Sequence, residues 1–119
     1  MLYLDTGCLV KLYYPEADSA RVQVGVANEL CALTALHRLE FASAFQGKRF
    51  RGEATAEQVA NALEALNLDQ AGGLFVESVV DWPAVFQMAE GFTNLHGAVT
   101  GVRSLDVLHC AIAMQVGAE

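Results

Sequence analysis

A chain of 119 residues is long enough to bury one hydrophobic core, and we expect a single domain over residues 1–119. Hydrophobic residues make up 54% of it, yet no apolar run approaches the roughly 20 residues of a membrane-spanning helix. The net charge of -7 opposes general attraction to nucleic acid, so a nucleic-acid ligand would need local basic side chains. Because an acid stands at position 5 and no basic leader precedes an apolar segment, we expect no signal peptide and a cytoplasmic protein.

The pattern of apolar residues predicts short strands that alternate with helices. Strands are expected at 1–4, 30–34 and 75–80, with a turn at Thr6-Gly7 after the first. Helices are expected at 8 to about 28 with an interruption at Pro15, at 35 to about 47, at 55 to about 70, from Pro83 to about 95, and from about 104 to 116. This alternation implies a three-layer α/β/α fold around a short parallel sheet with right-handed crossovers.

Several helix ends carry local signals. The segment Thr55-Ala-Glu-Gln58 has the form of a capping box, and Gly72-Gly73 is suited to ending the helix that it opens. Ser104 is the expected N-cap of the last helix. The three cysteines, Cys8, Cys31 and Cys110, lie far apart, without the close pairs that build zinc sites, and we expect them to be buried as small apolar residues.

Three carboxylates interrupt apolar stretches of the sequence. They are Asp5 in Leu-Tyr-Leu-Asp, Glu40 in Leu-His-Arg-Leu-Glu-Phe-Ala-Ser-Ala, and Asp106 in Ser-Leu-Asp-Val-Leu-His-Cys-Ala. Burying acids is costly unless a positive charge lies opposite, and no Lys or Arg is spaced to neutralise all three. We therefore expect a divalent metal. A cluster of oxygen ligands selects a hard cation such as Mg²⁺ or Mn²⁺, which proteins commonly use in phosphate chemistry.

The expected elements place these acids at informative positions. Asp5 follows the first strand at its carboxyl end, where open α/β sheets bind ligands. Glu40 lies within a stripe of small and apolar residues on the helix 35–47, and Asp106 lies in the first turn of the last helix, where the helix dipole favours an ionised acid. His109 lies three residues after Asp106 and is either a second ligand, an orienting group or a hydrogen-bonded core residue. His37 and His96 show no recognisable pattern.

Two further features have alternative interpretations. Phe41 and Phe45 share a second apolar face of the helix 35–47, which either contacts a partner or a second copy of the chain, or packs in the core. The basic segment Lys48-Arg49-Phe50-Arg51 either contacts phosphate or is a solvated helix end, where basic residues are favoured by the dipole.

The ordered set of Leu-Tyr-Leu-Asp5-Thr6, Glu40 and Leu105-Asp106-Val-Leu-His109-Cys-Ala-Ile-Ala resembles the PIN domain over essentially the whole chain. The closest subgroup is the VapC-like ribonuclease toxins of toxin–antitoxin modules. The resemblance implies that Asp5, Glu40 and Asp106 hold the metal, that the hydroxyl of Thr6 supports them, and that His109 occupies a recurrent position.

The resemblance also implies an activity and partners. It implies cleavage of single-stranded RNA by a metal-activated water, with Mg²⁺ or Mn²⁺ stabilising the charge that develops on the phosphate and the leaving oxygen. Lys48, Arg49 and Arg51 are the candidate RNA contacts. A cognate antitoxin is the expected protein partner, with an Arg or Lys that pairs with the carboxylates in place of metal, and a homodimer is also expected.

One departure from the PIN pattern opens an alternative function. PIN domains usually continue into another strand of the type Phe-Val-Thr-x-Asp, which supplies a fourth acid, whereas this sequence ends at Gly117-Ala118-Glu119. Without that C-terminal strand, residues 2–4 would form an open apolar sheet edge that favours self-association. The alternative is a catalytically impaired PIN-like binding module that acts through a protein partner.

Overall fold

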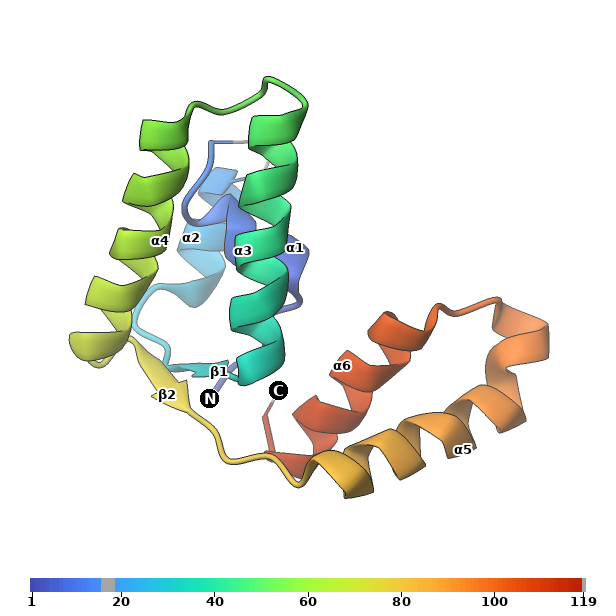
Figure 1. The fold of residues 1–119 in the computed structure, drawn as a ribbon. Coiled ribbons are helices and arrows are strands. Elements are labelled where there is room, and N and C mark those ends of the chain that lie inside the picture. Colours follow the sequence, from blue (N-terminus) through green and yellow to red (C-terminus); the bar gives the residue numbers. More distant parts are fainter. Residues whose placement is uncertain (16–18, 119) are drawn as a thin grey trace. The chain divides into compact units, whose positions relative to one another are not determined.

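The computed structural model describes residues 1–15 and 19–118 (Figure 1). The chain divides into two compact units, Met1–Glu77 and Ser78–Glu119. It is of mixed α/β type with a short parallel sheet, as predicted, whereas the single domain and the three-layer PIN-like arrangement stay predictions. The elements of the first unit are α1 (Thr6–Lys11), α2 (Ser19–Val26), β1 (Cys31–Leu33), α3 (Ala35–Phe50), α4 (Ala56–Ala71) and β2 (Phe75–Glu77), and those of the second are α5 (Trp82–Thr100) and α6 (Ser104–Gln115).

The sheet of the first unit is shorter than the sequence predicts. Strands β1 and β2 pair in parallel, with Cys31 opposite Phe75, and the connection between them runs through α3 and α4. The predicted strand at 1–4 is reduced to a single parallel bridge, in which Leu2 N donates to Leu30 O and Ala32 N donates to Leu2 O, both at 2.8 Å. The pairing stops there because the carbonyl of Leu4 accepts a hydrogen bond from a side chain of α3 instead of from the sheet.

The core of the first unit is built on the aromatic face of α3. The side chains of Phe41 and Phe45 are almost completely buried, and their ring centroids lie 4.8 Å apart. Phe41 also meets the ring of Tyr13 edge-on at 5.4 Å. The interpretation of this face as a partner surface is therefore wrong, and the core alternative is confirmed. Burial of two large aromatic rings removes a large apolar area from water. The other apolar stripe of α3 is not buried throughout, since Leu39 is 68% exposed.

The predicted signals at the ends of α4 are confirmed, whereas α3 and α5, expected to end at about 47 and about 95, continue to Phe50 and Thr100. Thr55 and Gln58 form the capping box, with Thr55 N donating to Gln58 Oε1 at 2.8 Å and Gln58 N donating to Thr55 Oγ1 at 3.1 Å. Gly73, directly after α4, has φ +86°, which favours glycine. Ser104 is not the N-cap of α6, because the extended backbone of Arg103 occupies that position and Ser104 is already helical. Positions 16–18 of the first predicted helix lie outside the described residues.

The cysteines differ in exposure. Cys31 lies in the core as predicted, and its burial raises the pKa of its thiol. Cys8 is half-buried, and Cys110 is exposed, so the prediction of burial is wrong for Cys110. Cys110 lies beside a pocket of the second unit, which leaves its side chain open to solvent.

The second unit is a pair of packed helices. Asp81 caps α5 by accepting a hydrogen bond from Ala84 N at 3.1 Å, and Asp81 N donates to Gln115 Oε1 of α6 at 2.8 Å. Helix α5 ends at Gly101, whose φ of +65° reverses the chain. The buried side chains at the packed face are Val85, Ala89, Val107, Leu108, Ala111 and Ile112. Within the described part of the chain, no helix combines the length and apolar character needed to cross a membrane.

Phe41→Ala tests the assignment of the core face of α3. We expect it to lower the free energy of unfolding by about 3–5 kcal/mol, because it removes a buried ring and leaves a cavity. Leu39→Ala on the same helix is the control and should change the value by no more than about 0.5 kcal/mol. Urea unfolding followed by circular dichroism measures both. Equal losses would contradict the burial pattern.

Tyr13→Phe tests a buried hydroxyl. Tyr13 donates to Asp69 Oδ2 of α4 at 2.5 Å, and burial together with this hydrogen bond raises the pKa of Tyr13 well above its usual value. Above about pH 10 the unfolded chain loses this proton while the folded protein keeps it, so the free energy of unfolding falls as the pH rises. We expect a shallower fall for Tyr13→Phe in urea titrations at pH 9, 10 and 11. Parallel curves for the two proteins would rule out this linkage.

Candidate functional site

Asp5 lies at the point where the N-terminal segment turns into α1. Its backbone is extended, with φ -68° and ψ 165°, and its Oδ1 accepts a hydrogen bond from Cys8 N at 2.8 Å. It is therefore the N-cap of α1, a role that suits a carboxylate because the helix dipole is positive there. The expected burial of the Asp5 carboxylate is wrong, since its side chain is exposed.

Thr6 and Glu40 join α1 to α3. Thr6 Oγ1 donates a hydrogen bond to Glu40 Oε1 at 2.9 Å, and both side chains are half-buried. Because Thr6 follows Asp5 directly, this hydrogen bond links the acid of α3 to the residue next to the acid that caps α1. Asp5, Thr6 and Glu40 therefore lie together within the first unit, although 34 residues separate the last two in the sequence.

A buried histidine fixes the chain just before Asp5. The backbone N–H of Thr34 donates to His37 Nδ1 at 3.1 Å, so the ring hydrogen lies on Nε2, which donates to Leu4 O at 2.7 Å. The His37 side chain is 1% exposed and its ring packs against that of Tyr3, with centroids 4.6 Å apart. His37 and Glu40 lie one turn apart on α3. The same helix face therefore holds the chain on both sides of Asp5.

Sequence reasoning missed this role of His37. Thr34 and His37 form a capping box at the start of α3, in which His takes the place that Glu or Gln usually has. The available signal was the Thr-x-x-His spacing directly after a predicted strand. The second contact of the ring, to Leu4, is not encoded by any local spacing.

Asp106 and His109 belong to the second unit. Asp106 lies in the first turn of α6 as predicted, but it is exposed, so its expected burial is wrong. His109 is 8% exposed, which the core alternative requires, while a role as ligand stays a prediction. The convergence of Asp106 with Asp5 and Glu40 also stays a prediction. Across residues 1–15 and 19–118, no three acidic, histidine or cysteine side chains form a group that could hold a metal ion.

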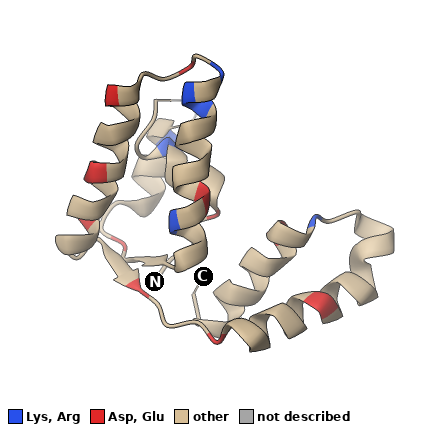
Figure 2. Ribbon diagram, in the orientation of Figure 1, with Lys and Arg blue, Asp and Glu red and all other residues tan. Residues whose placement is uncertain are grey.

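The predicted RNA contacts lie at the C-terminal end of α3, where Figure 2 shows basic residues gathered. Lys48 Nζ lies 4.1 Å from the ring centroid of Tyr14, and Arg49 is exposed. Arg51 pairs with Glu53 through two hydrogen bonds of 3.1 and 3.2 Å, and this pairing lowers the pKa of the Glu53 carboxyl and raises that of the Arg51 guanidinium. The Glu53 carboxylate therefore offsets part of the charge of Arg51 and also interacts with Lys48.

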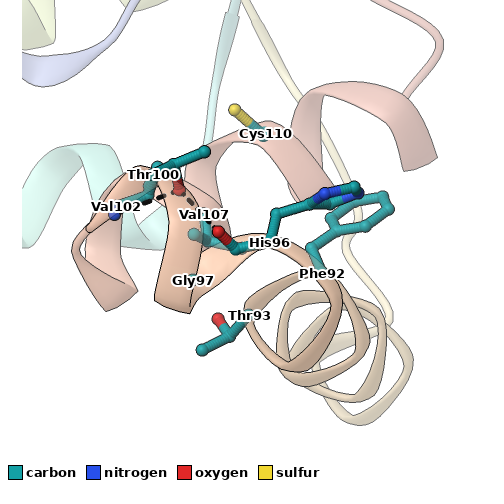
Figure 3. Close-up of a pocket in the computed structure, with 8 residues that line it drawn as sticks. All are labelled: Phe92, Thr93, His96, Gly97, Thr100, Val102, Val107 and Cys110. Carbon is teal, nitrogen blue, oxygen red and sulfur yellow. Dashed lines mark hydrogen bonds between the residues drawn. The ribbon is translucent and has the colours of Figure 1, made fainter.

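A pocket of about 180 Å³ lies in the second unit between α5, the following turn and α6 (Figure 3). Thr100 Oγ1 donates to the carbonyl of His96 at 3.0 Å at its edge. The described residues that line it are Phe92, Thr93, His96, Gly97, Thr100, Val102, Val107 and Cys110. Neither Asp106 nor His109 is among them, so this pocket is separate from the predicted metal residues of α6.

No protein-family model matches this chain, and no curated protein matches it either.

His37→Ala tests the contact that anchors the segment before Asp5. We expect a loss of about 2–4 kcal/mol in the free energy of unfolding, because the N–H of Thr34 and the carbonyl of Leu4 lose a buried partner and a cavity forms. The exposed His96 is the control, and His96→Ala should change stability by no more than about 0.5 kcal/mol. Urea unfolding measures both variants. A His37→Ala protein as stable as the parent would contradict the anchoring role.

Proposed function

We propose that this protein is a metal-dependent endoribonuclease of PIN-like fold that cleaves single-stranded RNA. In this proposal Asp5, Glu40 and Asp106 hold Mg²⁺ or Mn²⁺. The observation that carries it is the hydrogen bond of 2.9 Å from Thr6 to Glu40, because it ties the acid of α3 to the residue that directly follows Asp5. Carboxylates that converge at one point are typical ligands of a hard divalent cation.

The position of the two acids supports the proposal. Asp5 follows the parallel bridge between Leu2 and Cys31, and it therefore lies toward the carboxyl end of the sheet. Ligands of open α/β sheets bind beyond that end. The cap of α1 holds one oxygen of Asp5 through the hydrogen bond from Cys8 N and so fixes the direction of this carboxylate.

The residues have separate tasks in the proposed reaction. The hydrogen bond from Cys8 N holds one oxygen of Asp5, and that from Thr6 holds one oxygen of Glu40, so both carboxylates are oriented before substrate binds. A bound Mg²⁺ or Mn²⁺ would supply an activated water and neutralise charge on the phosphate. Asp106 completes the proposed set from the first turn of α6. His109 is a supporting residue in this proposal.

The proposed biological role is that of a toxin paired with an antitoxin. Exposed carboxylates such as Asp5 can pair with an Arg or Lys of a partner in place of metal. The partner contact cannot use Phe41 and Phe45, because both are buried in the core. A homodimer, if formed, must likewise use other surfaces.

Asp5→Asn and Glu40→Gln test the metal site. Each removes one charge and keeps a hydrogen-bond acceptor, so the cap of α1 and the bond from Thr6 should persist and stability should change by no more than about 0.5 kcal/mol. We expect Mn²⁺ affinity, measured by calorimetry, to fall at least tenfold, and cleavage of a fluorescent single-stranded RNA to fall at least about 100-fold.

Glu64→Gln is the matched control, because Glu64 is an exposed acid on α4 away from these contacts. It should bind Mn²⁺ and cleave RNA as the parent does. If Asp5→Asn cleaves as well as the parent, the nuclease proposal fails. If the parent neither binds Mn²⁺ nor cleaves RNA, the binding-module alternative takes its place.

A further inference from the structure

A second pocket, of about 290 Å³, lies in the first unit between the end of α1, α3 and α4. Its α4 side consists of residues at positions 58, 61, 62 and 65, which is one face of a helix. Two alanines on this face, Ala62 and Ala65, leave the space that larger side chains would fill. The described lining residues are Tyr13, Tyr14, Pro15, Phe45, Gln58, Asn61, Ala62 and Ala65.

The aromatic walls of this pocket are held in place. Tyr14 donates a hydrogen bond to the carbonyl of Glu53 at 2.6 Å, and its ring meets that of Phe45 edge-on at 6.1 Å. Tyr13 is fixed at its hydroxyl by Asp69 at 2.5 Å. Because the rings are already ordered, a planar ligand that stacks against them would cost little side-chain entropy.

The rim of the pocket carries polar groups of a particular kind. Lys48 is not among the described lining residues, but its ammonium lies 4.1 Å from the ring centroid of Tyr14, which is. The amide side chains of Gln58 and Asn61 lie on the α4 side, and Gln58 uses its Oε1 to accept from Thr55 N. Aromatic rings, amides and a cation are the groups that bind single-stranded nucleic acid, through base stacking, base edges and phosphate respectively.

Size and charge favour a nucleic-acid base over other ligands. The volume lies just below the 300–1,000 Å³ range of pockets for drug-sized ligands, so it suits one heterocyclic ring system and is too small for a peptide helix. Lys48 and Arg49 lie in the last turn of α3, the helix that also supplies the lining residue Phe45, whereas Arg51 is paired with Glu53. In a protein of net charge -7, this is a local site of attraction for phosphate.

We propose that this pocket binds one base of single-stranded RNA, with an adjoining phosphate on Lys48. The proposal rests on the proposed ribonuclease function and names a substrate subsite for it. Lys48 lies eight residues after Glu40 on α3, about 12 Å along the helix axis. The base in the pocket therefore belongs to a nucleotide beyond the scissile one, and the subsite positions the strand without taking part in the chemistry.

Ala65→Leu tests the pocket, because it fills the space without changing charge or helix propensity. Ala60→Leu is the matched control, since Ala60 is exposed and does not line the pocket. Binding of a labelled RNA hexanucleotide is measured by fluorescence anisotropy in EDTA, where cleavage cannot interfere. We expect Ala65→Leu to weaken binding at least tenfold, and Ala60→Leu to leave it unchanged.

Lys48→Met tests the phosphate contact. We expect weaker RNA binding, and a slope of log affinity against log salt concentration that is smaller by about one phosphate contact. Arg21→Gln, at an exposed position, is the control and should change neither the affinity nor the slope. If Ala65→Leu does not fold, as judged by circular dichroism, Asn61→Asp replaces it. That variant adds a negative charge at the rim and should weaken binding at least fivefold.

The outcomes separate this proposal from the nuclease itself. Equal affinity of Ala65→Leu and Ala60→Leu, or no RNA binding by the parent in EDTA, overturns the subsite. If Ala65→Leu leaves RNA affinity unchanged while Asp5→Asn abolishes cleavage, the subsite alone is overturned. If Ala65→Leu weakens RNA binding but the parent shows no Mn²⁺-dependent cleavage, the subsite is supported and the nuclease proposal fails. Displacement of the RNA by a proline-rich peptide, with tighter binding of the peptide, would make the pocket a protein-docking site and overturn the RNA assignment.

Discussion

The buried imidazole of His37 is the contact on which the candidate site of the first unit depends. Its Nδ1 accepts from Thr34 N and its Nε2 donates to Leu4 O, so one neutral ring joins the start of α3 to the N-terminal segment. The carbonyl of Leu4 is therefore not available for pairing in the sheet, and α1 begins directly after Asp5. Without this ring, two buried backbone groups would lack partners.

Helix α3 serves several functions because its faces differ. One face carries Phe41 and Phe45 into the core, and the neighbouring one carries His37 and Glu40 toward the N-terminal segment. Lys48, in its last turn, lies over the Tyr14 ring. A single helix thus fixes the spacing between Glu40 and Lys48.

The candidate site was predictable in part. The adjacency of Asp5, Thr6 and Glu40 was implied by the resemblance to PIN domains, and the hydrogen bond between Thr6 and Glu40 agrees with it. The expected burial of Asp5 and Asp106 was wrong, because both lie at helix N-termini, where an acid is stabilised without leaving solvent. The apolar residues around Asp5 and Asp106 therefore predicted secondary-structure elements near these positions, but not that these two side chains face solvent.

The sequence by itself determined the features that depend on contacts within one turn. The capping box of Thr55 and Gln58 follows from their spacing, and the positions of the helices follow from the apolar periodicity. The tertiary structure alone decided which apolar face of α3 is buried, and that the strand at residues 1–4 shrinks to one bridge. Both outcomes are competitions between distant segments for the same area or the same carbonyl. Local spacing does not indicate which contact forms, because the group that competes for Leu4 O, the His37 ring, lies some 30 residues away in the chain.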